Sequence, residues 1–212
     1  MATSQSQRLR HAAQKASRRK AVLAENRRSE TATKGGAQAR QVTVAARAPV
    51  KACIVSDGLF AEGMGQLVLA RTLPSGMVAA SFFLIDVWCL GVKDAFFVVM
   101  APQKFGDRMD ELRRQQPFID IDPSVARKLL HDAAAYAAGF GFAPSGDFAQ
   151  AEAIFGDIPM AMETFPFGKD GKPFFISGPH DSPTRIRRIL DTLAKRAGPD
   201  GFDFIAAMAD FD

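Results

Sequence analysis

The chain contains few of the residues that mark disulfide-rich or metal-binding proteins. Its 212 residues include two cysteines and three histidines. Cys53 and Cys89 form no CxxC pair and are too few for a disulfide framework. The histidines show no metal-ligand spacing. We therefore expect no bound metal or other cofactor. We expect Cys89 to be a buried apolar side chain rather than a nucleophile, since free cysteine is usually buried.

Long apolar runs are also missing. The nearest candidate, residues 77–92, is interrupted by Ser81 and Asp86, whereas a membrane span needs about 18 uninterrupted apolar residues. The N-terminus lacks the charged-then-apolar order of a secretory leader. The hydrophobic fraction of 47% is close to that of a soluble globular protein and is enough for one sizeable core. We expect a cytoplasmic protein without a membrane partner.

Acidic residues are scarce in the first 50 positions, which hold eleven Lys and Arg against two Glu, a net charge of +9. The remaining residues hold 16 basic and 21 acidic side chains, a net charge of −5. The basic segment has too few large apolar residues to form its own core. We therefore predict an N-terminal arm, residues 1–47, that is disordered or becomes helical on a partner, with a linker starting at Gly35-Gly36. Residues 48–212 are predicted to form one globular domain, the body.

A flexible basic arm favours binding to phosphate backbones, because neutralising phosphates releases counterions. The candidate nucleic-acid-binding residues are Arg8, Arg10, Lys15, Arg18, Arg19, Lys20, Arg27 and Arg28. No aromatic residue is interleaved with them, so base stacking is not indicated. The pattern does not distinguish DNA, RNA and the ribosome. An organellar targeting segment and a solvated tail without a partner are the alternatives.

The body shows the signals of an α+β fold, which we predict to be a mostly antiparallel sheet packed by helices. Strands are predicted at residues 49–58, 65–73, 77–87 and 94–100, with a strand, a tight turn and a returning strand at 165–177. Helices are predicted at residues 102–116, 122–141, 147–156 and 182–197. Both faces of the segment 77–87 are apolar, so we expect this strand to be central and covered on both sides.

Asp86 lies at the end of the most apolar predicted strand. Burying its charge is costly unless it is paired, and Lys93 and Arg71 are available as partners. Carboxylates with perturbed pKa values also mark catalytic sites. We interpret Asp86 as a residue that makes a salt bridge or a turn hydrogen bond at the sheet edge, with residues 91–94 forming a turn. A catalytic role is the alternative.

Two further groups of residues are candidate sites. One is a glycine-containing loop before a helix, which is a candidate anion site; its residues are Gly178, His180, Ser182 and Arg185. The alternative is ordinary helix capping, since Ser-Pro is common at a helix start. The carboxylates of Asp57, Glu111, Asp120 and Asp122 resemble the acidic set of the ribonuclease H-like fold. That resemblance implies a magnesium-dependent nuclease or phosphoryl-transfer enzyme, for which Asp57, Asp86, Glu111 and Asp120 are the candidate catalytic residues.

Two longer segments carry a second resemblance. "FLIDVWCLGVKDAFF" (residues 83–97) and "GKDGKPFFISGPHDSP" (residues 168–183) are similar to an uncharacterised group of bacterial proteins, over roughly residues 50–208. This resemblance implies a bacterial cytoplasmic protein and no particular catalytic residue. The sequence thus favours a non-catalytic nucleic-acid- or ribosome-associated protein. The metal-dependent enzyme and a protein-interaction module remain alternatives, and the oligomeric state is open.

Overall fold

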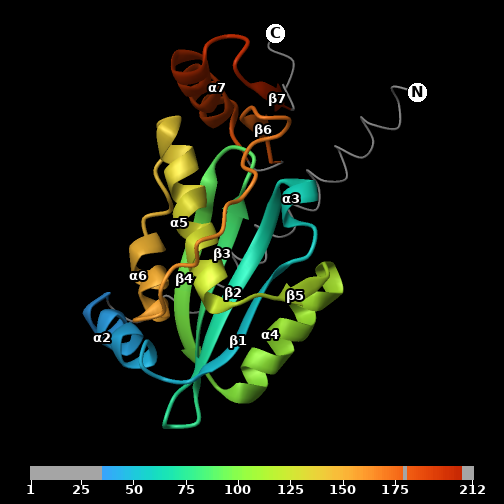
Figure 1. Cartoon of the computed structure of the whole chain (residues 1–212). Helices are drawn as coiled ribbons and strands as arrows, with labels where there is room; N and C mark the ends of the chain where they lie inside the picture. The colour runs from blue at the N-terminus through green and yellow to red at the C-terminus, as the bar shows by residue number, and fades with distance from the viewer. Residues whose placement is uncertain (1–34, 179–180, 207–212) are drawn as a thin grey trace.

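The fold is built on an antiparallel sheet of five strands in the order β4-β3-β2-β1-β5 (Figure 1). The computed structural model describes residues 35–178 and 181–206. The strands are β1 (Val50–Ser56), β2 (Met64–Thr72), β3 (Val78–Asp86), β4 (Gly91–Met100) and β5 (Phe118–Asp120). Every neighbouring pair is antiparallel. The predicted α+β class with an antiparallel sheet is confirmed.

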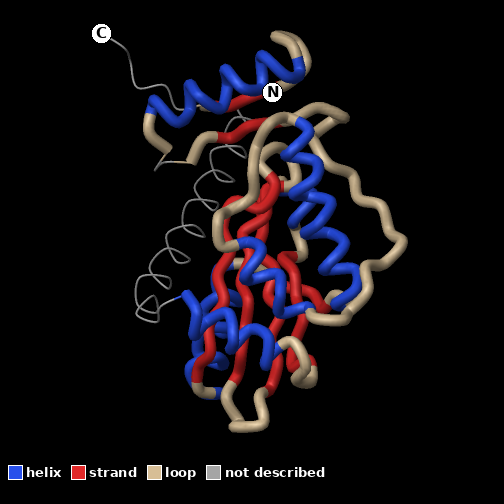
Figure 2. Tube along the Cα trace, turned by 90° about the vertical axis from the view of Figure 1, so that its left-hand side faces the viewer, coloured by secondary structure: helices blue, strands red, loops and turns tan. Residues whose placement is uncertain are grey.

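Helices cover both faces of this sheet, as the two apolar faces of β3 predicted (Figures 1 and 2). One face packs against α4, and the other against α2, α5, α6 and the short 3₁₀ helix η1. The helices are α2 (Gly35–Ala45), α3 (Leu59–Glu62), α4 (Pro102–Gln115), α5 (Pro123–Gly139), α6 (Phe148–Glu152), η1 (Ala153–Phe155) and α7 (Pro183–Ala197). Phe82 and Leu84 of β3 face α4, whereas Phe83 and Ile85 face α5. Within the described part of the chain, no helix has the length and apolar character of a membrane span.

The turn between β3 and β4 lies four residues earlier than the sequence predicted. Residues 87–90 form it, and residues 91–94 already belong to β4. Gly91 has a φ of 64°, and a Cβ there would lie 2.6 Å from the carbonyl oxygen of Ala133. A glycine is therefore required for the left-handed backbone and for the close approach of α5.

A β-bulge follows directly in β4. Leu84 is opposite Asp94 and Ile85 is opposite Val92, so Lys93 has no partner in the register. Bulges change the direction in which a side chain points. The Lys93 side chain is turned inward, with 5% of its surface exposed.

A small C-terminal unit lies over the end of the sheet at which this turn is located (Figure 2). It consists of β6 (Phe174–Ile176), α7 and β7 (Asp203–Ile205), and β6 pairs with β7 in parallel. The predicted tight turn does form between Lys169 and Lys172. The predicted pairing is wrong, however, because β6 pairs with β7 rather than with the segment before the turn.

The N-terminal boundary of the fold also differs from the prediction. Residues from Gly35 onward form α2 instead of a linker, and Val42 and Ala45 are buried against the sheet. The last part of the predicted arm, α2, therefore packs against the body. Residues 1–34 of the arm, with all eight candidate nucleic-acid-binding residues, lie outside the described residues.

Candidate functional site

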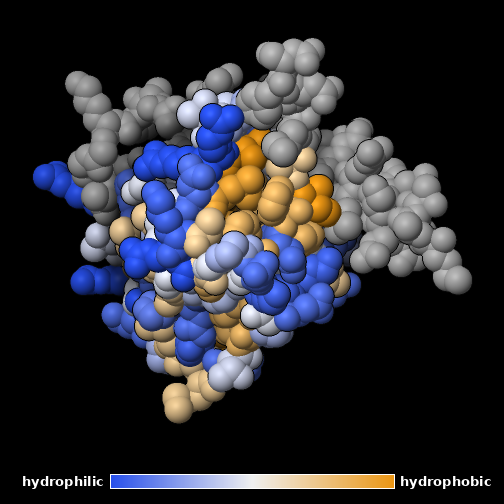
Figure 3. Space-filling model, turned by 90° about the horizontal axis from the view of Figure 1, so that it is seen from above, coloured by the Kyte–Doolittle hydropathy of each residue, from blue (hydrophilic) through white to orange (hydrophobic). Residues whose placement is uncertain are grey.

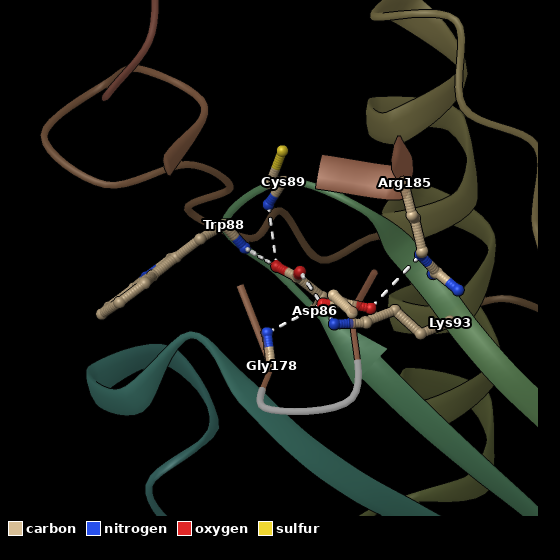
Figure 4. A network of polar contacts seen from close by, with 7 residues as sticks. Asp86, Trp88, Cys89, Lys93, Gly178 and Arg185 are labelled. Atoms are coloured by element: carbon tan, nitrogen blue, oxygen red, sulfur yellow. Dashed lines mark hydrogen bonds and ion pairs between the residues drawn. The ribbon is translucent and has the colours of Figure 1, made fainter. Parts of the chain in front are cut away.

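Asp86 closes the turn that follows β3. Its Oδ1 accepts hydrogen bonds from the backbone N–H groups of Trp88, at 3.1 Å, and Cys89, at 2.9 Å. Its Oδ2 lies 4.0 Å from Nζ of Lys93, the bulge residue (Figure 4). Both proposed kinds of contact, the turn hydrogen bond and the salt bridge, are thus present. They occur at the end of an interior strand rather than at the sheet edge, since β4 separates β3 from solvent on that side.

The environment of Asp86 opposes its ionisation. Burial raises the pKa of the carboxyl group, while the charge of Lys93 and the turn N–H groups act in the other direction. Burial dominates, because taking a carboxylate out of water costs more than these contacts return. Asp86 therefore resembles a buried structural carboxyl group, held by its own turn.

A second buried carboxylate, Asp181, comes from the loop before α7. The N–H of Gly178 donates to its Oδ2 at 2.8 Å, and Nε of Arg185 lies 3.3 Å from its Oδ1. Only 3% of the Asp181 side chain is exposed. Figure 4 shows Gly178 and Arg185 next to Asp86 and Lys93, so the loop meets the end of β3 here. The sequence analysis did not select Asp181, although its position just before the helix cap is a signal for such a contact.

This geometry bears directly on the predicted anion site. Gly178 and Arg185 are both engaged by the carboxylate of Asp181. The hydroxyl of Ser182 accepts from the backbone N–H of Arg185 as an ordinary helix cap. His180 lies outside the described residues. The carboxylate of Asp181 therefore occupies the position that an external anion would need. Ser182 acts as a helix cap, which was the alternative interpretation of this loop.

Cys89 lies beside the carboxyl group of Asp86 and is fully buried. Burial raises the pKa of its thiol, and the charge of Asp86 raises it further. Burial likewise raises the pKa of Cys53 to about 12. A nucleophilic cysteine needs a lowered pKa, so both thiols stay protonated at neutral pH. This agrees with the predicted role of Cys89 as a buried apolar side chain.

The four candidate metal ligands do not meet. Asp57 is exposed after β1, and Glu111 is exposed on α4, where it pairs with Arg114. Asp120 is exposed on the edge strand β5, whereas Asp86 is buried at the end of β3. Across the described residues, no three His, Cys, Asp or Glu side chains are grouped as metal ligands. The arrangement of two metals held by Asp57, Asp86, Glu111 and Asp120 is thus not formed.

Arg71, the other proposed partner of Asp86, has a different role. Its side chain lies at the other end of the sheet from Asp86 and is buried, with 5% of the residue exposed. The guanidinium donates to the carbonyl oxygens of Ala48, Ile154 and Phe155. These carbonyls follow α2 and lie in η1, so one side chain of β2 fastens two helical segments to the sheet. Burial lowers the pKa of Arg71.

Comparisons with protein-family models, with curated proteins and with solved structures found no match to this chain.

Proposed function

We propose that this protein is a non-catalytic, nucleic-acid- or ribosome-associated protein of the cytoplasm, and that it binds phosphate backbones through its basic arm. The observation that carries the proposal is the charge distribution, +9 in residues 1–50 against −5 in the remainder. The net positive charge of such a segment attracts a polyanion, whereas the net charge of the remainder does not. The attraction is sequence-independent, and the entropy of released counterions drives it.

The body contributes support of a different kind. Its buried carboxyl groups, Asp86 and Asp181, are held by turn N–H groups, Lys93 and Arg185. Catalytic carboxylates need at least one face directed to a substrate. Carboxyl groups that are buried and contacted by their own fold favour a binding protein over the magnesium-dependent enzyme.

The test is binding of the full chain to fluorescent 24-base-pair DNA and RNA duplexes over a salt series, with magnesium present and absent. Co-sedimentation with ribosomes extends it to the third partner. The variant replaces the eight candidate arm residues, Arg8, Arg10, Lys15, Arg18, Arg19, Lys20, Arg27 and Arg28, with Gln. If all eight contact DNA phosphates, log K of the wild type falls with log salt at a slope of about −7, and the variant loses this slope.

The matched control keeps the charge by replacing the six arginines among these residues with Lys. It should retain the salt slope, because backbone binding depends on charge more than on the guanidinium group. Equal binding by the wild type and the Gln variant would refute the proposal. Cleavage of the duplex that needs magnesium and persists in the Gln variant would favour the enzyme instead.

A further inference from the structure

The solvent face of α7 carries an excess of positive charge. Five basic side chains are exposed on this helix against the single acidic residue Asp191; they are Arg185, Arg187, Arg188, Lys195 and Arg196. On α4 the exposed charges balance, with Lys104, Arg113 and Arg114 against Asp107, Asp110 and Glu111. Positive charge is therefore concentrated on α7, although the body as a whole is acidic.

Three of these side chains form the basic stripe, which consists of Arg188, Lys195 and Arg196. At 3.6 residues per turn their positions fall within an arc of about 100°, and they extend over roughly 12 Å of helix. Ile186, Ile189 and Leu193 of α7 are buried in the C-terminal unit and hold the helix in place. Arg188 and Lys195 point away from this buried side, and Arg196 lies at its border; all three side chains are exposed.

The stripe lies at one end of the molecule. α7 lies across this end, over β6 and β7 (Figure 2), and hydrophilic residues gather on the side where α7 lies when that end is viewed directly (Figure 3). Arg185, whose guanidinium pairs with Asp181, is not part of the stripe, and this ion pair fastens the start of α7 to the loop before it. The stripe thus presents cations from a rigid helix, in contrast to a flexible segment that must be ordered on binding.

We propose that the basic stripe is a second binding surface for the nucleic-acid backbone, on the folded body and separate from the arm. The inference rests on the proposed function for the kind of partner. A DNA duplex carries one negative charge per ~1.7 Å of its axis, so a stripe of about 12 Å lies within reach of several phosphates. The arm captures the polymer, and the stripe fixes the orientation of the body on it.

The buried side of α7 decides between a nucleic acid and a membrane. Helices that bind anionic membranes insert an apolar face between the lipids and keep basic residues at the border. The apolar side of α7 is packed inside the C-terminal unit and is not available for insertion. A polyanion that needs only surface contact fits this helix better than a lipid surface does.

The experiment compares two variants of the full chain with equal net charge. The first replaces Arg188, Lys195 and Arg196 of the stripe with Gln, and the control replaces Lys51, Lys104 and Arg113 with Gln. All six residues are exposed, so unchanged melting temperatures are expected for both. The probes are the 24-base-pair DNA duplex over a salt series and vesicles that contain phosphatidylserine.

We expect the stripe variant to bind DNA with a salt slope smaller by about 2 to 3, and the control to match the wild type. Equal losses in the two variants would show an effect of net charge alone and would overturn the inference. Binding to the vesicles that depends on the stripe, without such an effect on DNA, would also overturn it.

The arm variant keeps this outcome separate from that of the proposed function. Loss of binding with the neutralised arm, but not with the stripe variant, refutes the stripe and leaves the arm proposal standing. The reverse result supports the stripe and refutes the arm. If the wild type binds neither duplex, both proposals fail.

Discussion

Replacing Arg71 with Met should cause a large loss of stability. The substitution keeps a long apolar side chain but removes every donor to the carbonyl oxygens of Ala48, Ile154 and Phe155. Leaving a buried polar group without its hydrogen bond costs about 1–3 kcal/mol. Carbonyl groups lie at the low end of this range, because they tolerate missing partners better than N–H groups do.

Three carbonyls at about 1 kcal/mol each give a destabilisation of about 3 kcal/mol. Relief from burying the guanidinium charge reduces the cost, and the weakened attachment of α2 and η1 adds to it. For a protein of this size the loss corresponds to a decrease in melting temperature of roughly 6–12 °C. The destabilisation of about 3 kcal/mol is a large part of the 5–15 kcal/mol by which a typical folded protein is stable.

The assay is urea and thermal unfolding, followed by circular dichroism and by the fluorescence of Trp88, the single tryptophan. Arg71→Lys should fall between the wild type and Arg71→Met, because one ammonium group cannot reach all three carbonyls. Arg113→Met on the exposed face of α4 is the control, with an expected change within about 0.5 kcal/mol. If Arg71→Met lowers the free energy of unfolding by less than about 1 kcal/mol, Arg71 does not fasten α2 and η1 to the sheet.

Three further predictions concern the turn after β3 and its surroundings. The folded-state pKa of Asp86 is raised above the ordinary value of 3.8, so its contribution to stability should decrease as the pH rises from 3.8 through the raised pKa. The difference in unfolding free energy between the wild type and Asp86→Asn should change with pH in that window, and a constant difference would contradict the pKa shift. Cys53 and Cys89 should react with a thiol reagent at neutral pH only after unfolding, because both are buried protonated thiols; rapid modification of the folded protein would argue against this. Gly91→Ala should destabilise by about 3 kcal/mol, because strain at positive φ adds to a clash, whereas Gly76→Ala, with a similar φ and no atom within 4 Å, should cost only about 1 kcal/mol; equal melting temperatures for the two variants would be the opposing result.

Features determined by neighbouring residues could be predicted from the sequence. The hairpin of β2 and β3 follows from two apolar runs around Gly76, and the starts of α5 and α7 follow from Asp122 and Ser182, which both cap their helices. The buried side of α7 follows from the helical spacing of Ile186, Ile189 and Leu193. In each case the signal and the structure lie within a few residues of one another.

Features that depend on distant contacts could not be predicted in this way. Arg71 binds carbonyls up to 84 residues away, and no local pattern indicates that these would be its partners. The bulge at Lys93 depends on how β4 aligns with β3, which the alternation of apolar residues does not fix to one residue. α2 begins with Gly35 and Gly36, which have low helix propensity, and the packing of Val42 and Ala45 against the body stabilises it as a helix.

The same limit applies to the candidate site. The sequence offered Lys93 and Arg71 as possible partners of Asp86, because an isolated buried charge needs a partner, and of the two Lys93 is the one that lies beside it. It did not identify Asp181, which reaches the same place from the C-terminal unit. Asp181 binds the very groups, Gly178 and Arg185, from which an anion site was predicted.

The packing of the β3–β4 turn against the C-terminal unit has a consequence for synthesis on the ribosome. Cys89 and Leu90 of the turn are buried by Phe175, Ile186 and Leu193. The chain between the turn and the end of α7 is about 100 residues long and takes roughly 5–20 s to translate. During this interval the sheet can form while its turn remains uncovered. Chaperones and proteases can therefore recognise the exposed turn of the nascent chain until α7 packs over it.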